Sequence, residues 1–366
     1  MSKLLSRRQF LNFTTTALAG FSSFTLASLL RNNSLSAADK VIKNLEARVP
    51  VLMRNALIPG LSIAVIRNGE VFWSRGFGVT NQVNRRPVNN DTIFAAASLS
   101  KPFVGYAALK MIERGQLELD RPLSDYTAKP YISDPRLNLI TVRRILSHTT
   151  GFPNWSGDAP LRILRAPGTK FVYSGEGFLY LQKVIEEITQ MPLAQYLQQN
   201  LLEPLGMNSS SFIWQSAYDQ TASDGHDRQA KPRPMGKPRQ ASAAGSLRTT
   251  AIDYAQFIIA MMAPGEVDSP NLSEASLKTM LTPQIKINHK LDWGLGWGLE
   301  KASNGNFFWH WGDLVTFKSI TVASFDLGTG IVILTNSQNG LKISRDVVQQ
   351  VIGGQHPAFD FWMIEY

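Results

Sequence analysis

The chain has 366 residues, no cysteine and a formal net charge of +9. The absence of cysteine excludes disulfide bonds, thiolate metal sites, a cysteine nucleophile and a lipid-modified N-terminal cysteine. The length allows one large domain or two small ones, with a core that needs no metal or disulfide for stability.

Residues 1–38 are predicted to be a twin-arginine export signal. Arg7 and Arg8 lie in the motif Ser-Arg-Arg-Gln-Phe-Leu, and an uncharged stretch follows as far as Leu30. The small residues at 36–38 favour cleavage before Asp39. The stretch is rich in Thr, Ser and Gly, which does not favour a membrane anchor. We therefore expect a protein exported to the periplasm or another extracytoplasmic space, with the twin-arginine translocation machinery as a partner.

The charge of the mature chain does not indicate a nucleic-acid partner. The signal carries four cationic residues and no acidic one, so its removal lowers the net charge from +9 to +5. This modest charge comes with no nucleic-acid-binding motif. We expect a small-molecule or peptide substrate, and the sequence does not indicate an oligomeric state.

Strands are predicted near both ends of the chain and helices in between. The pair Asn68-Gly69, flanked by two apolar runs, predicts a β-hairpin. The predicted strands cover residues 61–66, 71–78, 294–300, 307–311, 319–325 and 331–335. The predicted helices cover residues 41–56, 102–114, 141–147, 176–189, 251–262 and 342–352.

This order of elements predicts an α+β fold. An antiparallel sheet flanked by terminal helices would be built from about 39–97 and 285–366. An α-helical domain, about 98–284, would be inserted between its two parts, all within one domain over 39–366.

The first chemical motif is Ser98-Leu99-Ser100-Lys101. A serine and a lysine three residues apart lie on one face of a helix, one turn from each other. Their Ala and Phe neighbours indicate burial, which disfavours the ammonium form and makes the amine a base for the hydroxyl. The pattern by itself also fits an ordinary pair on a helix surface, so the rest of the chain has to decide.

Two further motifs follow, Tyr173-Ser174-Gly175 and His310-Trp311-Gly312. With the Ser-x-x-Lys motif, the three stand in an order that resembles the serine hydrolases comprising class C β-lactamases, D-Ala-D-Ala carboxypeptidases and related esterases. Segments between the motifs extend the resemblance from about Ile42 to Thr335. The fold that the resemblance implies, β-lactamase/transpeptidase-like, agrees with the order of elements.

The resemblance implies a role for each motif residue. Ser98 would be the nucleophile, and Lys101 would hold and help deprotonate it. Tyr173 would be the general base and acid, which at neutral pH needs help from the positive charge of Lys101 or of a protonated His310. The backbone N–H groups of Ser98 and Asp313 would form the oxyanion hole.

The departures from the family pattern concern substrate recognition. The second motif usually ends in Asn, whose amide contacts a side-chain amide of the substrate, whereas this chain has Gly175. The acid next to it, Glu176, is a disfavoured substitute. After Gly312 the segment from Asp313 is bulkier than usual, which would narrow the site. Trp311 is expected in the core or, because of its place in the motif, in the pocket wall, and Trp155 is a candidate for the cleft rim.

Other sites are disfavoured by the sequence. The Ser-His-Thr-Thr-Gly context of His148 predicts a structural role in a turn. The remaining histidines, His226, His289 and His356, show no metal-ligand spacing, so neither a metal nor a cofactor is expected. The chain has no Gly-x-Ser-x-Gly motif, so an α/β-hydrolase is disfavoured.

The sequence thus predicts an exported serine hydrolase that forms an acyl-enzyme. A cell-wall D-amino-acid peptide and a carboxylic ester remain equally favoured substrates. A β-lactam is less favoured because of Gly175 and His310. A non-hydrolytic binding protein that keeps the fold is the alternative from another functional class.

Overall fold

The computed structural model describes residues 37–266 and 268–364. The chain divides into two compact units, Met1–Lys43 and Asn44–Tyr366, and the second contains the whole sheet. The predicted export signal lies outside the described residues, apart from Ala37 and Ala38, which begin a helix. Within the described ranges, the helices lack the combination of length and apolar character that crossing a membrane requires.

The longer strands lie near the two ends of the chain, and the region between them is mostly helices and loops. The α-helices are α2 (Ala37–Ala56), α3 (Ser100–Glu113), α4 (Val142–Leu146), α5 (Gly175–Thr189), α6 (Leu193–Leu197), α7 (Tyr218–Thr221), α8 (Ala251–Ala260), α9 (Glu274–Met280) and α10 (Ser344–Ile352). Short 3₁₀ turns are η1 (Ala97–Leu99), η2 (Leu123–Tyr126), η3 (Pro135–Leu139), η5 (Gly340–Ile343) and η6 (Pro357–Asp360), and η4 (Gln198–Leu202) is a π-helical turn. The strands are β1 (Gly60–Arg67), β2 (Glu70–Gly78), β3 (Phe94–Ala95), β4 (Gly225–His226), β5 (Pro232–Arg233), β6 (Arg248–Thr249), β7 (Ile285–Lys286), β8 (Leu291–Trp293), β9 (Gly298–Ala302), β10 (Gly305–Asp313), β11 (Lys318–Ser324) and β12 (Thr329–Thr335).

Eight strands form one antiparallel sheet in the order β2-β1-β12-β11-β10-β9-β8-β7. The N-terminal hairpin joins the C-terminal strands where β1 pairs with β12, with Leu61 opposite Thr335. The hairpin turns at Asn68 and Gly69, whose φ angles of 52° and 73° are those of a two-residue turn with two left-handed positions. The predicted α+β architecture, an antiparallel sheet with covering helices, is confirmed.

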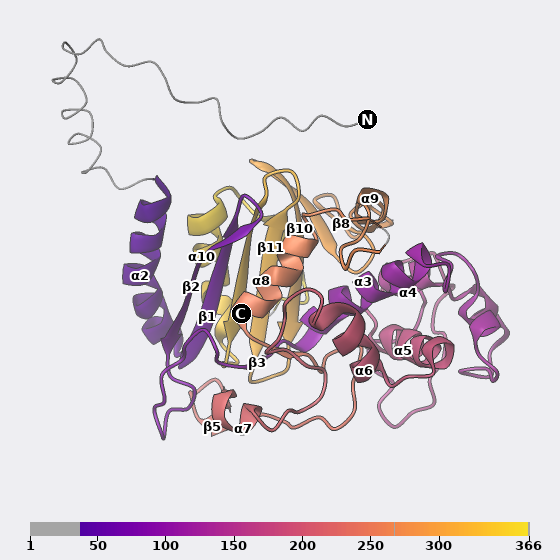
Figure 1. Ribbon diagram of the computed structural model, residues 1–366, viewed down its shortest axis with the longest axis horizontal. Helices are drawn as coiled ribbons and strands as arrows, with labels where there is room; N and C mark the ends of the chain where they lie inside the picture. Colours follow the sequence, from indigo (N-terminus) through magenta and orange to yellow (C-terminus); the bar gives the residue numbers. More distant parts are fainter. Residues whose placement is uncertain (1–36, 267, 365–366) are drawn as a thin grey trace, which may run out of the picture. The chain divides into compact units, whose positions relative to one another are not determined.

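Both faces of the central strands are buried. Ala64 and Ile66 of β1 belong to the core cluster that contains the side chains of α8, while the alternating Ile63 and Val65 are equally buried on the other face. Helix α8 packs against β1 and β12, and α10 packs against β12. Figure 1 shows these two helices on opposite sides of the sheet. Because helices cover both faces, β1 is apolar at nearly every position.

Helix α3 is the central helix of the helix-rich part, which Figure 1 shows beside the sheet. Twelve of its fourteen residues are buried, so it is apolar all round instead of amphipathic. Pro102 stands in its first turn, where a missing N–H costs no helical hydrogen bond. The burial of this helix carries Lys101 into the interior.

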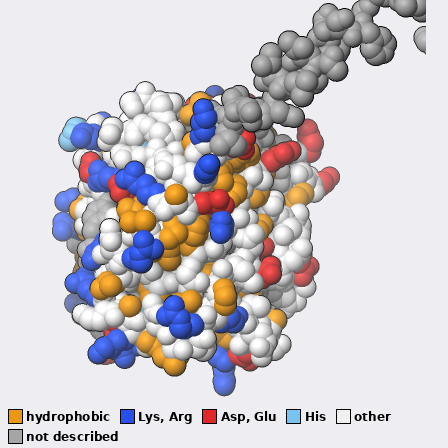
Figure 2. All heavy atoms as spheres, turned by 90° about the vertical axis from the view of Figure 1, so that its left-hand side faces the viewer, with side chains coloured by type: hydrophobic (Ala, Val, Ile, Leu, Met, Phe, Trp, Pro, Cys, Tyr) orange, Lys and Arg blue, Asp and Glu red, His pale blue; other side chains and the backbone are white. Residues whose placement is uncertain are grey.

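The edge strand β2 is only half covered. Two of its aromatic side chains, the exposed Phe72 and the buried Phe77, lie beside arginines: the Arg67 guanidinium is 5.1 Å from the Phe72 ring centre, and that of Arg75 is 5.3 Å from the Phe77 ring centre. Figure 2 shows the side of the molecule that carries this edge, with Lys and Arg dispersed among hydrophobic side chains. Charged side chains along an edge strand hinder pairing with another sheet.

One predicted strand begins later than expected. The strand expected over residues 294–300 starts at Gly298, because the backbone before it is hydrogen-bonded to the C-terminal ends of α9 and α4 instead of to a neighbouring strand. The N–H of Leu295 donates to the Met280 carbonyl, and that of Gly296 donates to the Leu146 carbonyl. This connection fastens the sheet to the helix-rich part.

Candidate active site

Ser98 and Lys101 meet at the start of α3. The Lys101 Nζ lies 3.0 Å from the Ser98 Oγ and donates to the Ala244 carbonyl at 2.7 Å. Lys101 is fully buried, whereas Ser98 is partly exposed. Burial lowers the pKa of the lysine from 10.5 to about 7. The amine is therefore substantially unprotonated near neutral pH and can accept the serine proton.

The turn that carries Ser98 is strained and tightly held. The preceding Ala97 has φ 52°, in the left-handed region that residues with a Cβ rarely adopt. The Ser100 Oγ donates to the Ala97 carbonyl at 2.7 Å, and the Tyr254 hydroxyl donates to the Leu99 carbonyl at 3.0 Å. These hydrogen bonds fix the backbone on both sides of the candidate nucleophile.

Tyr173 lies over the same lysine. The Lys101 Nζ is 5.0 Å from the centre of the Tyr173 ring. The buried Tyr173 hydroxyl has no hydrogen-bond partner of normal geometry among the described residues. Burial raises the pKa of the phenol well above its ordinary value, and the nearby Ser98 hydroxyl lowers it only in part. Tyr173 is therefore a neutral phenol, suited to giving a proton to a leaving group. The expectation that it also works as the base at neutral pH is not supported.

His148 holds Tyr173 in place. Its Nδ1 accepts a hydrogen bond from the Ser174 N–H at 3.0 Å, and its ring lies 4.2 Å from that of Tyr173, centre to centre. Burial lowers the pKa of His148 well below its usual value, so it is neutral. This geometry agrees with the structural role predicted for it.

His310, in the middle of β10, is also neutral. Its Nδ1 donates to the Trp311 carbonyl at 2.7 Å, which leaves the buried Nε2 as an acceptor. Burial, with a smaller effect of the Lys101 charge, lowers the pKa of His310 to about 3. The expectation that a protonated His310 assists Tyr173 is therefore wrong, because burial disfavours the charged imidazolium.

The end of β10 approaches the Ser98 turn closely. A Cβ on Gly312 would lie 2.3 Å from the Ala96 carbonyl oxygen and 2.2 Å from the Ser319 Oγ. The Ser319 Oγ also donates to the Ala96 carbonyl at 2.9 Å, which joins β11 to the same turn. Only glycine fits at this contact between β10 and the Ser98 turn. The two predicted oxyanion donors, the N–H groups of Ser98 and Asp313, lie close to the contact along the chain.

The side chains of Asp313 and Trp311, at the end of β10, make different contacts. The Asp313 carboxylate pairs with Lys318 and accepts the Val315 N–H at 2.9 Å, which shapes the turn between β10 and β11. Trp311 is only 3% exposed and packs 5.0 Å from both Tyr173 and Phe361, centre to centre. Of its two expected positions, Trp311 therefore occupies the core, as a support for Tyr173.

Trp155 covers the place where the family pattern has an amide side chain. A Cβ on Gly175 would lie 2.5 Å from the Trp155 Cη2. The indole is 55% exposed, and its ring centre is 6.0 Å from the Lys101 Nζ. Sequence reasoning placed Trp155 at the rim but missed its contact with Gly175, which joins positions twenty residues apart.

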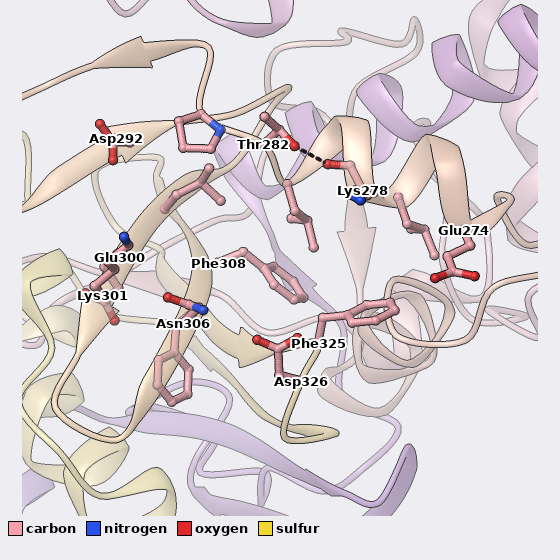
Figure 3. A pocket seen from close by; sticks show the side chains of 15 residues that line it. Glu274, Lys278, Thr282, Asp292, Glu300, Lys301, Asn306, Phe308, Phe325 and Asp326 are labelled. Atoms are coloured by element: carbon pink, nitrogen blue, oxygen red, sulfur yellow. Dashed lines mark hydrogen bonds between the residues drawn. The ribbon is translucent and has the colours of Figure 1, made fainter.

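Another pocket lies away from this cluster. Its wall comes from α9, β8, β9 and β10 and includes Phe308, Phe325 and Asp326 (Figure 3). None of the predicted site residues lines it. Within 37–266 and 268–364, no group of His, Asp or Glu side chains could hold a metal ion.

A sequence model of the family described as "Beta-lactamase" matches residues 41–351. "Esterase EstB" of Burkholderia gladioli is 29% identical over 230 residues, 54% of this chain and 58% of that protein. "Protein flp" of Staphylococcus aureus strain N315 is 25% identical over 329 residues, 84% of this chain. The chain thus spans 58% and 64% of the length of these two relatives.

The fold is also found in solved structures. A D-alanine carboxypeptidase AmpC from Burkholderia cenocepacia aligns with a TM-score of 0.76 and 20% identity, over 86% of this chain and 99% of that one. A class C beta-lactamase aligns with a TM-score of 0.77 and 19% identity, over 88% of this chain and 97% of that one. At these identities the likeness shows the fold alone.

Proposed function

The chain belongs to the beta-lactamase family of serine hydrolases, and from this premise we propose that it hydrolyses carboxylic esters through an acyl-enzyme on Ser98. The observation that carries the proposal is the fully buried Lys101 amine, 3.0 Å from a partly exposed serine hydroxyl. With its pKa near 7, this amine can take the serine proton without a histidine.

The residues divide the proton transfers between them. The Ser98 Oγ attacks the ester carbonyl carbon while its proton passes to Lys101. The oxyanion is held by the backbone N–H groups of Ser98 and Asp313. Tyr173 protonates the departing alkoxide and regains a proton from Lys101. A water molecule then attacks the acyl carbonyl and gives a proton to Lys101, and the Ser98 oxygen leaves and takes that proton from Lys101.

The recognition side of the site favours an ester over an amide-bearing substrate. Gly175 offers no side-chain amide, and Trp155 occupies the space beside it. The relative named as an esterase supports the same substrate class.

A D-amino-acid peptide is the second candidate. Its amide carbonyl offers Ser98 and Lys101 the same point of attack as an ester carbonyl, and the sequence favours the two substrates equally. We also propose that the protein is exported by its twin-arginine signal and acts outside the cytoplasm. β-Lactam hydrolysis and non-hydrolytic binding are the remaining alternatives.

Intact-mass spectrometry of the mature protein tests the proposal. The protein is mixed with an activated short-chain ester or with a penicillin, beside the Ser98→Ala variant. We expect a transient acyl adduct and turnover with the ester, both absent in Ser98→Ala. Turnover of the penicillin instead would favour the β-lactamase alternative. A folded protein that forms no adduct with either reagent contradicts the ester proposal.

A further inference from the structure

Trp155 is held rigidly against the start of α5 by both of its neighbours. The Asn154 carbonyl accepts the N–H groups of Gly175 at 3.0 Å and of Glu176 at 3.2 Å. On the other side, the N–H and Oγ of Ser156 donate to the Glu176 carboxylate at 2.8 Å and 2.7 Å. A half-exposed indole fixed in this way is a preformed surface, and its contact with a ligand loses little conformational entropy.

The indole also leaves no room for a polar group beside it. Three atoms of its six-membered ring, Cη2, Cζ3 and Cζ2, lie 2.5–2.8 Å from the position of a Cβ on Gly175. The polar groups on either side are engaged, since Asn154 Oδ1 accepts the Gly175 N–H at 3.0 Å and Glu176 binds Ser156. A substrate in contact with the Trp155 indole is therefore in contact with a flat apolar surface.

The Trp155 indole lies within reach of a group attached to Ser98. The Lys101 Nζ is 3.0 Å from the Ser98 Oγ and 6.0 Å from the centre of the Trp155 ring. In the proposed acyl-enzyme, the acyl group extends from that Oγ and remains there after the alcohol has left. A contact with Trp155 therefore acts on the acid part of the substrate.

We propose that Trp155 determines the acyl specificity of the enzyme, selecting esters of apolar, preferably aromatic, carboxylic acids by stacking on its indole. This inference rests on the proposed ester hydrolysis and adds the class of acid to it. Aromatic groups prefer offset or edge contacts with an indole, and such contacts add to the free energy of simple burial.

The test compares p-nitrophenyl acetate with p-nitrophenyl benzoate, which share a leaving group and differ only in the acyl part. Trp155→Ala is expected to lower the ratio of kcat/KM for benzoate over acetate about tenfold, and Trp155→Phe to lower it less. Phe72→Ala serves as the control, because Phe72 is 40% exposed and lies on the edge strand β2, which carries none of the site residues. A variant with less folded protein loses activity toward both esters by the same factor, so the ratio of the two kcat/KM values does not change.

Gly175→Ala provides a second, independent measurement. Its Cβ would displace the indole, so the substitution should lower the benzoate-to-acetate ratio in the wild type and leave it unchanged in Trp155→Ala. Equal effects of Trp155→Ala on both esters, or additive effects of the two substitutions, would overturn the proposal. These outcomes differ from failure of the proposed function, in which the wild type forms no Ser98-linked acyl group from either ester.

Discussion

At the scale of single residues, the site depends on which buried groups carry charge. Lys101, Tyr173 and His310 are all buried, and burial shifts each pKa toward the neutral form of the side chain. The lysine becomes a base near pH 7, the tyrosine stays a proton donor, and the histidine stays an acceptor. In the proposed mechanism, Lys101 and Tyr173 therefore both start as neutral groups when the Ser98 proton is transferred.

The first prediction concerns the pH dependence of catalysis. Because Lys101 acts in its unprotonated form, kcat/KM for an activated ester should rise about tenfold per pH unit below its pKa of about 7 and level off above it. Lys101→Ala should lower kcat by roughly 10²–10⁴-fold. Lys183→Ala, on the surface of α5, is the control and should leave the profile unchanged. A wild-type profile without this rise would contradict the base role of Lys101.

A second prediction concerns His310. With a pKa of about 3, its ring should stay neutral, with the proton on Nδ1, throughout the range from about pH 5 to 8. Nitrogen chemical shifts of labelled histidine, assigned with a His310→Gln variant, would show this directly. Titration of His310 within that range would refute the assignment and restore a role for its positive charge.

At the scale of elements, the site is the junction of η1 with the end of β10. The Ser98 turn is held by hydrogen bonds from α8 and β11, and Gly312 lets the strand approach it. The proposed oxyanion hole would therefore depend on the spacing between two backbones, which a single methyl group is large enough to change.

The third prediction tests this spacing. Gly312→Ala should push β10 away from η1 and lower kcat by roughly 10²-fold through the displaced oxyanion donor. The crowding should also reduce the free energy of unfolding by about 1–3 kcal/mol. Steady-state kinetics and chemical denaturation measure the two effects. Gly236→Ala, with no atom within 4 Å of its Cβ position, is the control, and equal kinetics of the two variants would argue against the close approach.

At the scale of the whole molecule, the C-terminal segment supports the site from behind. His356 and Glu300 form a pair at 2.6 Å with both side chains fully buried, and the other Glu300 oxygen accepts the Ala358 N–H at 2.6 Å. These contacts fasten the segment that places Phe361 against Trp311, the support of Tyr173. The buried pair near the end of the chain is thus connected to Tyr173 through the rings of Phe361 and Trp311.

The fourth prediction follows from this pair. Glu300→Gln replaces one carboxylate oxygen by an NH₂ group, so either His356 or the Ala358 N–H loses its buried acceptor, and the free energy of unfolding should fall by about 1–3 kcal/mol. Asp360→Asn, which breaks the exposed Arg345–Asp360 pair of the same segment, should cost less than about 1 kcal/mol. Urea denaturation of both variants makes the comparison. Similar losses in the two variants would show that the buried pair does not hold the segment.

What the sequence determined by itself is local. The spacing of Ser98 and Lys101 and the Asn68-Gly69 turn depend on residues within one turn of each other. The predicted fold also followed from the order of elements. The export signal stays a prediction.

Only the tertiary structure decided the charge states of Lys101 and His310 and the contact of Trp155 with Gly175. The pKa of Lys101 depends on its burial, and its second hydrogen bond comes from Ala244, 143 residues away. The neutrality of His310 and the contact between Trp155 and Gly175 likewise arise from segments that meet only in the fold. A periodic pattern records which face of an element is apolar, but desolvation and steric contact depend on what packs there.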